Sequence, residues 1–228
     1  MGTKVLVQVR LELPRKTVVT DPLATVHPAA KGRLKRMADI AIAGSAAFLL
    51  APLVLLAAGV VIARLGRPLL FRDERAGLGG MPITVYKLRT MTNARDARGQ
   101  LLSDAQRLSS TGRILRALSI DELPQLISVL RGEMSLVGPR PLPTRYLERY
   151  SPEQARRHNV KPGITGLVQV SGRNLLSWDE KFELDVWYVD NWSLWLDVKI
   201  LFRTLWHVVR RKGIHAQGEA TMREFLGS

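Results

Sequence analysis

Two adjacent carboxylates, Asp121 and Glu122, stand out in a chain of 228 residues whose net charge is +14. Arg116 precedes them, and Arg131 and Arg140 follow. Acids at the start of a helix often do no more than oppose the helix dipole. Beside a helix N-terminus and several arginines, which together suit a phosphate, an ionised carboxylate could instead hold a divalent cation or attack phosphorus. The residues alone leave both interpretations open.

The acids are expected at the N-terminus of a helix that ends at Gly132. Its start has two candidate positions. Ser119 could be the N-cap, with Glu122 completing a capping box. Alternatively Asp121 is the N-cap, which puts Pro124 in the first turn, where proline costs little. The helix itself is indicated by the spacing of Leu123, Leu126, Ile127 and Leu130.

Further cations come from two other segments. The stretch "PLLFRDERAGLGGMPITVYKLRTM" predicts two strands around a glycine-rich turn, and alternation puts Lys87 and Arg89 on one face of the second strand. In "VGPRPL", Arg140 lies between two prolines that restrict its backbone, although a rigid turn alone would also explain this piece. In "KPGITG", Gly163 and Gly166 could let the backbone approach a ligand or could simply form a turn.

An uncharged run from Ile40 to Ala63 predicts a membrane segment, since 24 residues make a helix of about 36 Å. A single spanning helix is the simplest interpretation. However, Pro52 lies mid-run and favours a kink, and both flanks are basic, whereas positive residues prefer the cytoplasmic side. We therefore expect a re-entrant hairpin that bends at Pro52 and returns. The flanking charges are Lys31, Arg33, Lys35 and Arg36 before the run, and Arg64, Arg67, Arg72 and Arg75 after it.

The last quarter of the chain holds all five tryptophans and a predicted amphipathic helix over residues 197–212. Such a helix could pack on a core or lie in a membrane interface, and its tryptophans and basic face favour the interface. Its apolar side carries Val198, Leu201, Phe202, Leu205, Val208 and Val209.

Composition excludes some chemistry. There is no cysteine, so thiolate nucleophiles, disulfides and cysteine-based zinc sites are ruled out, and the four histidines have no metal-ligand spacing. The predicted fold is mostly α with a small β-hairpin (α+β), in a monotopic membrane protein. Its parts are an N-terminal extension (1–30) with a strand-like alternation, a re-entrant helix-break-helix (31–66) and a catalytic domain (67–228) with interfacial amphipathic helices.

The sequence closely resembles the bacterial sugar transferase family, the monotopic phosphoglycosyl transferases. The matching pieces are "KRMAD", "FRDERAGLGGMPITVYKLRTM", "LRALSIDELPQLISVLRGEMSLVGPRPL", "KPGITGLVQVSGRN" and "WDEKFELDVWYVDNWSLWLDVKIL", in the family's order over roughly residues 31–213. The ending "GEATMREF" resembles small members of the family and favours an N-acetylated amino sugar of the bacillosamine type. Two positions depart from the common pattern: Ala51-Pro52 replaces Ser-Pro, and "KLRTM" replaces "KFRTM".

The resemblance implies transfer of a sugar 1-phosphate from a UDP-sugar to undecaprenyl phosphate, with Mg²⁺ required and UMP released. Carried over by position, Asp121 is the nucleophile and a metal ligand, and Glu122 is its acidic partner. Lys87, Arg116 and Arg140 surround the phosphates. The expected location is the cytoplasmic face of a bacterial inner membrane, among its lipids, and residues 1–30 could pair across a homodimer or bind another pathway protein.

Two rival functions fit part of the sequence. A non-catalytic scaffold for anionic lipid has no use for two acids ringed by cations. A nucleic-acid binder would fit the net charge, but it leaves the uncharged run and the tryptophans unexplained, and no such motif is present. No nucleic-acid partner is therefore expected.

Overall fold

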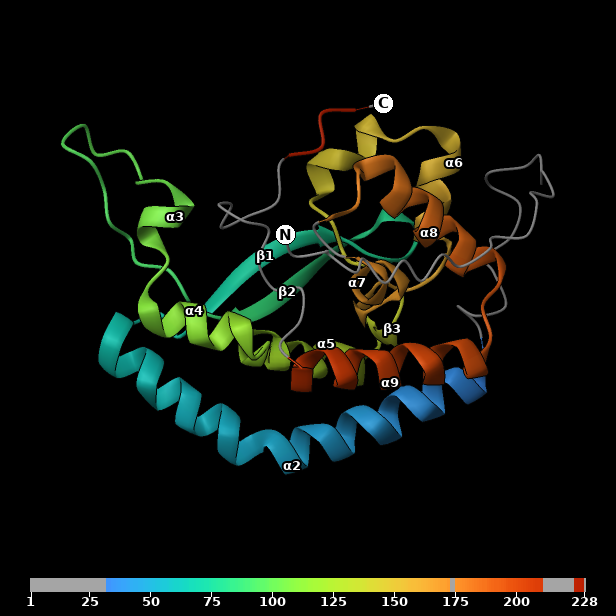
Figure 1. Cartoon of the computed structure of the whole chain (residues 1–228), viewed down its shortest axis with the longest axis horizontal. Helices are drawn as coiled ribbons and strands as arrows, with labels where there is room; N and C mark the ends of the chain where they lie inside the picture. Colours follow the sequence, from blue (N-terminus) through green and yellow to red (C-terminus); the bar gives the residue numbers. More distant parts are fainter. Residues whose placement is uncertain (1–31, 173–174, 211–223, 228) are drawn as a thin grey trace, which may run out of the picture.

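The computed structural model describes residues 32–172, 175–210 and 224–227. The described part is mostly helical and carries two two-stranded sheets, so the expected α+β class is confirmed. Figure 1 shows the long helices α2 (Arg33–Leu65) and α9 (Leu194–Arg210) along one side, with the sheets and short helices stacked above them. The predicted N-terminal strand lies outside the described residues.

Helix α2 runs through Pro52 without a break in its assignment. Proline removes one helical hydrogen bond and crowds the preceding turn. Figure 1 accordingly shows α2 bent, with its convex side away from the rest of the molecule. The expected helix-break-helix is therefore a bend within one helix. α2 is the one helix in the described part that is long and apolar enough to cross a membrane.

Both arms of α2 pack on the same body of protein. The first arm buries residues four apart, Lys35, Asp39 and Ala43, and the second buries Ala57 and Val61. No α2 residue between Ala43 and Ala57 is buried. The exposed middle carries large apolar side chains: Phe48 (80% exposed), Leu49, Leu55 and Leu56. The two ends of α2 are thus attached to one domain while the bend projects from it.

The predicted hairpin is confirmed as β1 (Leu70–Ala76) and β2 (Pro82–Leu88), which pair antiparallel. The turn η1 (Leu78–Gly80) uses Gly79 and Gly80 at positive φ, as the glycine-rich segment predicts. In the register, Lys87 pairs with Phe71. β2 packs against the turn of helix that carries the paired acids, which brings Lys87 toward them.

A second, parallel pair joins β3 (Ser135–Val137) to β4 (Gly163–Thr165). Gly138, Gly163 and Gly166 allow the two segments to touch. An added Cβ on Gly163 would lie 2.1 Å from Gly138 N, and one on Gly166 would lie 2.2 Å from Gly138 O. The glycines of "KPGITG" therefore serve a close approach of backbone to backbone.

The remaining elements connect these parts. The helices before β3 are α3 (Asp104–Arg107), α4 (Ser110–Ala117), η2 (Ile120–Gln125) and α5 (Leu126–Arg131). After β3 come η3 (Thr144–Arg149), α6 (Pro152–Ala155), η4 (Arg156–Asn159), α7 (Leu167–Ser171) and α8 (Trp178–Asp190). The main core is formed by buried residues of α2, β2, α5, β3, α7, α8 and α9, and Ile164 of β4 packs against it.

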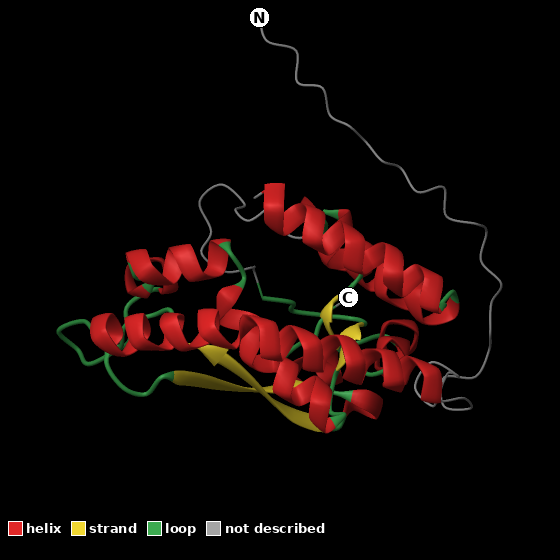
Figure 2. Cartoon of the chain, turned by 90° about the horizontal axis from the view of Figure 1, so that it is seen from below, coloured by secondary structure: helices red, strands yellow, loops and turns green. Residues whose placement is uncertain are grey.

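Helix α9 confirms the predicted amphipathic helix, and much of its apolar face is exposed. Phe202 is 70% exposed, and Trp195, Leu205 and Trp206 are also exposed, whereas Ile200 is buried in the core. Figure 2, seen from below, shows α9 and α2 on the same face of the molecule. This face therefore presents two apolar helical surfaces side by side.

Candidate active site

The paired acids lie in η2, a 3₁₀ turn that precedes α5. Ser119, the residue before η2, adopts the left-handed conformation (φ 55°, ψ 21°) and its side chain makes no capping hydrogen bond. Ser119 is therefore the N-cap residue, one of the two predicted candidates, but the predicted capping box does not form, and the alternative is wrong because Asp121 lies inside the first turn. The expectation that both acids lie at a helix N-terminus is confirmed, and so is the stop at Gly132 (φ 87°).

Glu122 is the meeting point of two cations. Lys87 Nζ donates to Glu122 Oε1 over 2.6 Å. Arg140 donates through Nη2 to the same oxygen over 2.7 Å and through Nη1 to Oε2 over 3.5 Å. Burial alone would raise the pKa of Glu122, but the charges of Arg140 and Lys87 and their hydrogen bonds hold that pKa well below its usual range. Glu122 is consequently an ionised anchor for both cations.

Asp121 has a different environment from its neighbour. It is 6% exposed, and no described group donates a hydrogen bond to its carboxylate. Burial raises the pKa of Asp121, the negative charge of Glu122 adds to the rise, and Lys87, Arg116 and Arg140 oppose it. A carboxylate with open oxygens and a raised pKa is more basic than usual, and therefore a better nucleophile.

Lys87 and Arg140 reach the acids from separate elements, the end of β2 and the loop after β3. Burial lowers the pKa of Lys87, and this outweighs the opposing effect of Glu122, while the charge of Arg140 lowers it further. The charge of Glu122 raises the pKa of Arg140 against the effect of burial. The side chain of Arg140 is 43% exposed, so its guanidinium remains accessible from solvent.

Arg116 joins the site from α4. Its Nε donates to Thr90 Oγ1 over 3.1 Å, and its positive charge acts on Asp121. The structure thus brings together all five residues expected from the sequence: Lys87, Arg116, Asp121, Glu122 and Arg140. Their formal charges sum to +1, which suits a phosphate-bearing ligand.

Arg89 does not join this cluster, contrary to the strand alternation. β2 ends at Leu88, so the alternation stops there. The Arg89 guanidinium instead donates to the carbonyls of Leu65 and Arg67, at the C-terminal end of α2. A cation at a helix C-terminus stabilises the carbonyls left without helical partners.

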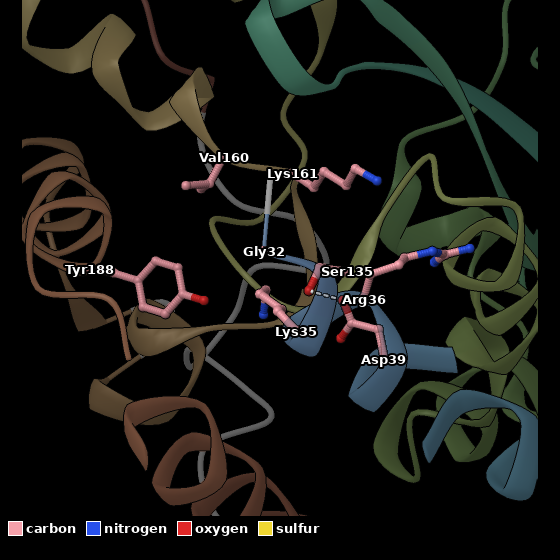
Figure 3. Close-up of a pocket in the computed structure, with 8 residues that line it drawn as sticks. All are labelled: Gly32, Lys35, Arg36, Asp39, Ser135, Val160, Lys161 and Tyr188. Atoms are coloured by element: carbon pink, nitrogen blue, oxygen red, sulfur yellow. Dashed lines mark hydrogen bonds between the residues drawn. The ribbon is translucent and has the colours of Figure 1, made fainter. Parts of the chain in front are cut away.

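Sequence reasoning missed a polar network that fixes the first arm of α2. Lys35 Nζ donates to Asp197 Oδ2 over 2.5 Å and to Val137 O over 3.2 Å. Tyr188 donates to Asp197 as well, over 2.7 Å. Figure 3 shows Lys35 and Asp39 on the first turns of α2, with Tyr188 facing them across a small pocket. Lys35 was expected as a free basic flank, and it is instead buried with a partner.

Two further residues of "KRMAD", Arg36 and Asp39, also fix this arm of α2 through polar contacts. Asp39 accepts from Ser135 Oγ over 2.9 Å and from the Leu136 amide over 3.1 Å, as Figure 3 shows for Ser135. Arg36 donates to the carbonyls of Val129 and Leu130, at the C-terminal end of α5. The i, i+4 spacing of Lys35 and Asp39 is the sequence signal that could have indicated a shared buried face.

The described residues contain no group of three or more metal-ligating side chains. Asp121 is nevertheless a suitable single ligand, because no donor among the described residues occupies its oxygens and Mg²⁺ is commonly held by one or two carboxylates plus substrate phosphates. Glu122 fits a metal less well, since both of its oxygens accept from cations.

Known proteins match nearly the same stretch of the chain as the motifs do. A family model described as bacterial sugar transferase matches residues 30–211. The chain is 53% identical over 198 residues to the uncharacterized sugar transferase EpsL of Bacillus subtilis, covering 86% of this chain and 96% of that protein. It is 48% identical over 185 residues to a UDP-glucose:undecaprenyl-phosphate glucose-1-phosphate transferase of Caulobacter vibrioides (75% and 68%). It is 40% identical over 171 residues to an undecaprenyl-phosphate galactose phosphotransferase of Salmonella typhimurium (68% and 36%).

Proposed function

The chain belongs to the bacterial sugar transferase family, and on that premise we propose that it moves a sugar 1-phosphate from a UDP-sugar to undecaprenyl phosphate and releases UMP. The observation that carries this proposal is the contrast between the two acids. Asp121 has open oxygens and a raised pKa, while its neighbour Glu122 holds two cations beside it. Neither a lipid-binding scaffold nor a nucleic-acid binder requires that arrangement.

In the proposed reaction, an oxygen of Asp121 attacks the donor phosphorus that bears the sugar. The bond from this phosphorus to the oxygen of UMP breaks, UMP leaves with the electron pair, and the sugar phosphate stays on Asp121 as an acyl phosphate. A phosphate oxygen of the lipid then attacks the same phosphorus. The Asp121 carboxylate is expelled, and a polyprenyl diphosphate sugar is formed. Glu122 takes no covalent part and keeps Lys87 and Arg140 in place.

The three cations stabilise the charge that phosphoryl transfer concentrates. Transfer between two anions needs fixed positive charge where the transition state places negative charge. Of the two cations paired with Glu122, Arg140 is the more exposed, so its guanidinium can reach a diphosphate while it stays paired with Glu122. Asp121 would hold Mg²⁺ together with the donor's phosphates, and a bound Mg²⁺ would neutralise part of the diphosphate charge.

The membrane arrangement we propose is monotopic, on the cytoplasmic face. A spanning helix puts its ends on opposite sides of the bilayer, whereas both arms of α2 pack on one domain, through Asp39 and Val61. The bend at Pro52 is also the exposed, apolar part of α2. With the exposed face of α9 beside it, this surface would set the site at the interface, where a soluble donor and a lipid acceptor both arrive.

The identity of the donor sugar is the most specific part of the proposal. Relatives carry glucose or galactose in their names, and the "GEATMREF" ending of this chain favours an N-acetylated amino sugar instead. A panel of UDP-sugars, each assayed for UMP release with undecaprenyl phosphate in detergent, distinguishes the three.

The covalent step is tested with a labelled UDP-sugar in the absence of lipid acceptor. The protein should release UMP up to one equivalent and carry a phosphosugar on the peptide that contains Asp121. Asp121→Asn should release none and carry no adduct, although asparagine keeps the shape of the side chain. UMP release that requires the lipid, with no adduct trapped, would instead indicate direct transfer.

A further inference from the structure

A buried ion pair outside the active site has no part in the chemistry above. Arg157, from η4, is 3% exposed, and Asp185, from α8, is 4% exposed. Arg157 donates to Asp185 Oδ2 through Nε over 3.0 Å and through Nη2 over 2.7 Å. Burying such a pair seldom stabilises a fold more than apolar side chains of the same volume would, so packing alone explains it poorly.

The pair has a third member in the active-site loop. Arg157 Nη2 also donates to the backbone carbonyl of Arg140 over 2.8 Å. The guanidinium serves Asp185 and the carbonyl from two nitrogens fixed in one plane, an arrangement that the single ammonium nitrogen of lysine does not reproduce. The rings of Tyr150 and Phe182 lie 5.9 Å and 5.7 Å from Arg157, and they further restrict its position.

The loop around Arg140 depends on its carbonyls. Pro139 and Pro141 have no amide hydrogen, so this stretch has few donors to fix it. The carbonyl of Pro139 accepts from Gly163 N over 2.9 Å, and the carbonyl of Arg140 accepts from Arg157. Arg157 thus holds the backbone of the residue whose side chain ends at Glu122.

We propose that Arg157, oriented by Asp185, is a positioning residue that sets the Arg140 guanidinium on Glu122 and keeps it beside Asp121. This inference rests on the proposed function only for its kinetic consequence. The positioning itself is a property of the resting protein. Arg157 touches no substrate, so its effect on the reaction should pass through Arg140.

The variant that tests this is Arg157→Lys, which keeps a positive charge for Asp185 but has one donor nitrogen in place of the two that reach Asp185 and the Arg140 carbonyl. The matched control is Arg156→Lys, since the adjacent Arg156 also forms ion pairs, with Glu153 and Asp190, but makes no contact with the Arg140 carbonyl. Both variants are compared in wild-type and Arg140→Gln backgrounds. Melting temperature is recorded for each protein.

We expect Arg157→Lys to slow UMP release about tenfold in the wild-type background and less than about twofold in the Arg140→Gln background. Arg156→Lys should change neither rate. A general loss of structure would lower the rate in both backgrounds alike, and that result would overturn the inference. If Arg157→Lys does not fold, the rate of Asp185→Asn is measured in the same two backgrounds. This variant keeps an acceptor for Arg157.

A second measurement needs no activity, so it separates this inference from the proposed function. The rate at which phenylglyoxal modifies Arg140 is followed by peptide mass spectrometry in the resting protein. Arg157→Lys should raise that rate severalfold, because Arg140 would leave Glu122 more often, and Arg156→Lys should not. An unchanged rate would overturn the positioning role even if UMP release were confirmed. A raised rate without any UMP release would leave the positioning intact and remove the proposed function.

Discussion

Asp121 and Glu122 are adjacent in the chain, yet Glu122 accepts hydrogen bonds from Lys87 and Arg140 while no described group donates one to Asp121. The two carboxylates differ because of what surrounds them and not because of their own chemistry. Burial dominates at Asp121 and raises its pKa, whereas at Glu122 the paired cations overcome the same burial. This asymmetry gives each acid a separate, testable role.

Neutralising either acid should affect different parts of the reaction. Asp121→Asn removes the proposed nucleophile and should lower UMP release by more than about a thousandfold. Glu122→Gln weakens the anchor of Lys87 and Arg140, a loss of about 1.5–3 kcal/mol, or roughly ten- to over a hundredfold in rate. Glu122→Gln should still form the adduct on Asp121 when labelled donor is added alone. Adduct formation that fails in Glu122→Gln but persists in Asp121→Asn would reverse the assignment.

The same two substitutions should change stability in opposite directions at neutral pH. Because burial raises the pKa of Asp121, its charge costs stability above that pKa, so Asp121→Asn should raise the melting temperature. The pKa of Glu122 is lowered, so its charge stabilises the fold above the ordinary value of 4.5, and Glu122→Gln should lower the melting temperature. About 1 kcal/mol corresponds to about 2–4 °C at this size. Thermal melts in detergent with EDTA provide the measurement, and shifts of one sign for both would contradict the asymmetry.

Each active-site arginine should contribute through charge. Arg116→Ala and Arg140→Ala should each slow turnover roughly ten- to over a hundredfold, since a contact to a charged group is typically worth about 1.5–3 kcal/mol. Arg113→Ala is the control for Arg116, because Arg113 is exposed on the same helix, α4. Steady-state UMP release measures all three. Near-normal rates for both active-site variants would exclude them from the site.

The topology of α2 can be tested by labelling introduced cysteines, because the chain has no native cysteine. Single cysteines at Thr25 and Met81, which lie on either side of α2 in sequence, should both be protected from an impermeant thiol reagent in intact cells. Both should react once the cells are opened. Labelling of only one from outside would require a spanning helix, despite the packing of both arms on one domain.

Stability should fall in mild acid through His158. This side chain is 7% exposed, and burial, with the charge of Arg157, lowers the pKa of His158 to about 3 from 6.5. Between those values the unfolded chain binds a proton that the folded chain excludes, so stability is lost as the pH falls. At pH 5 the loss is about 2 kcal/mol. His158→Gln keeps a donor for the Gly77 carbonyl and should flatten the melting temperature between pH 7 and pH 5, whereas an unchanged slope would exclude His158 as its source.

Much of the local structure followed from the sequence because its causes are local. The uncharged run, the glycine-rich turn, the stop at Gly132 and the face of α9 are each set by residues within a few turns of one another. The five site residues could be named before the fold was known, through the motifs that carry them. The capping box was predicted wrongly, because Ser119 adopts a left-handed conformation and its side chain makes no capping hydrogen bond.

The tertiary structure decided which of these residues meet. Lys87 and Glu122 are 35 positions apart, and Lys35 and Asp197 are 162 apart. The spacing of residues along one element predicts which face they share but carries no information on what that face contacts. For this reason Arg89 was expected beside Lys87 and caps α2 instead, and the contact of the "KPGITG" glycines with Gly138 was not foreseen. The different fates of Asp121 and Glu122 have the same origin, since burial and opposing charge exist only once distant segments have packed together.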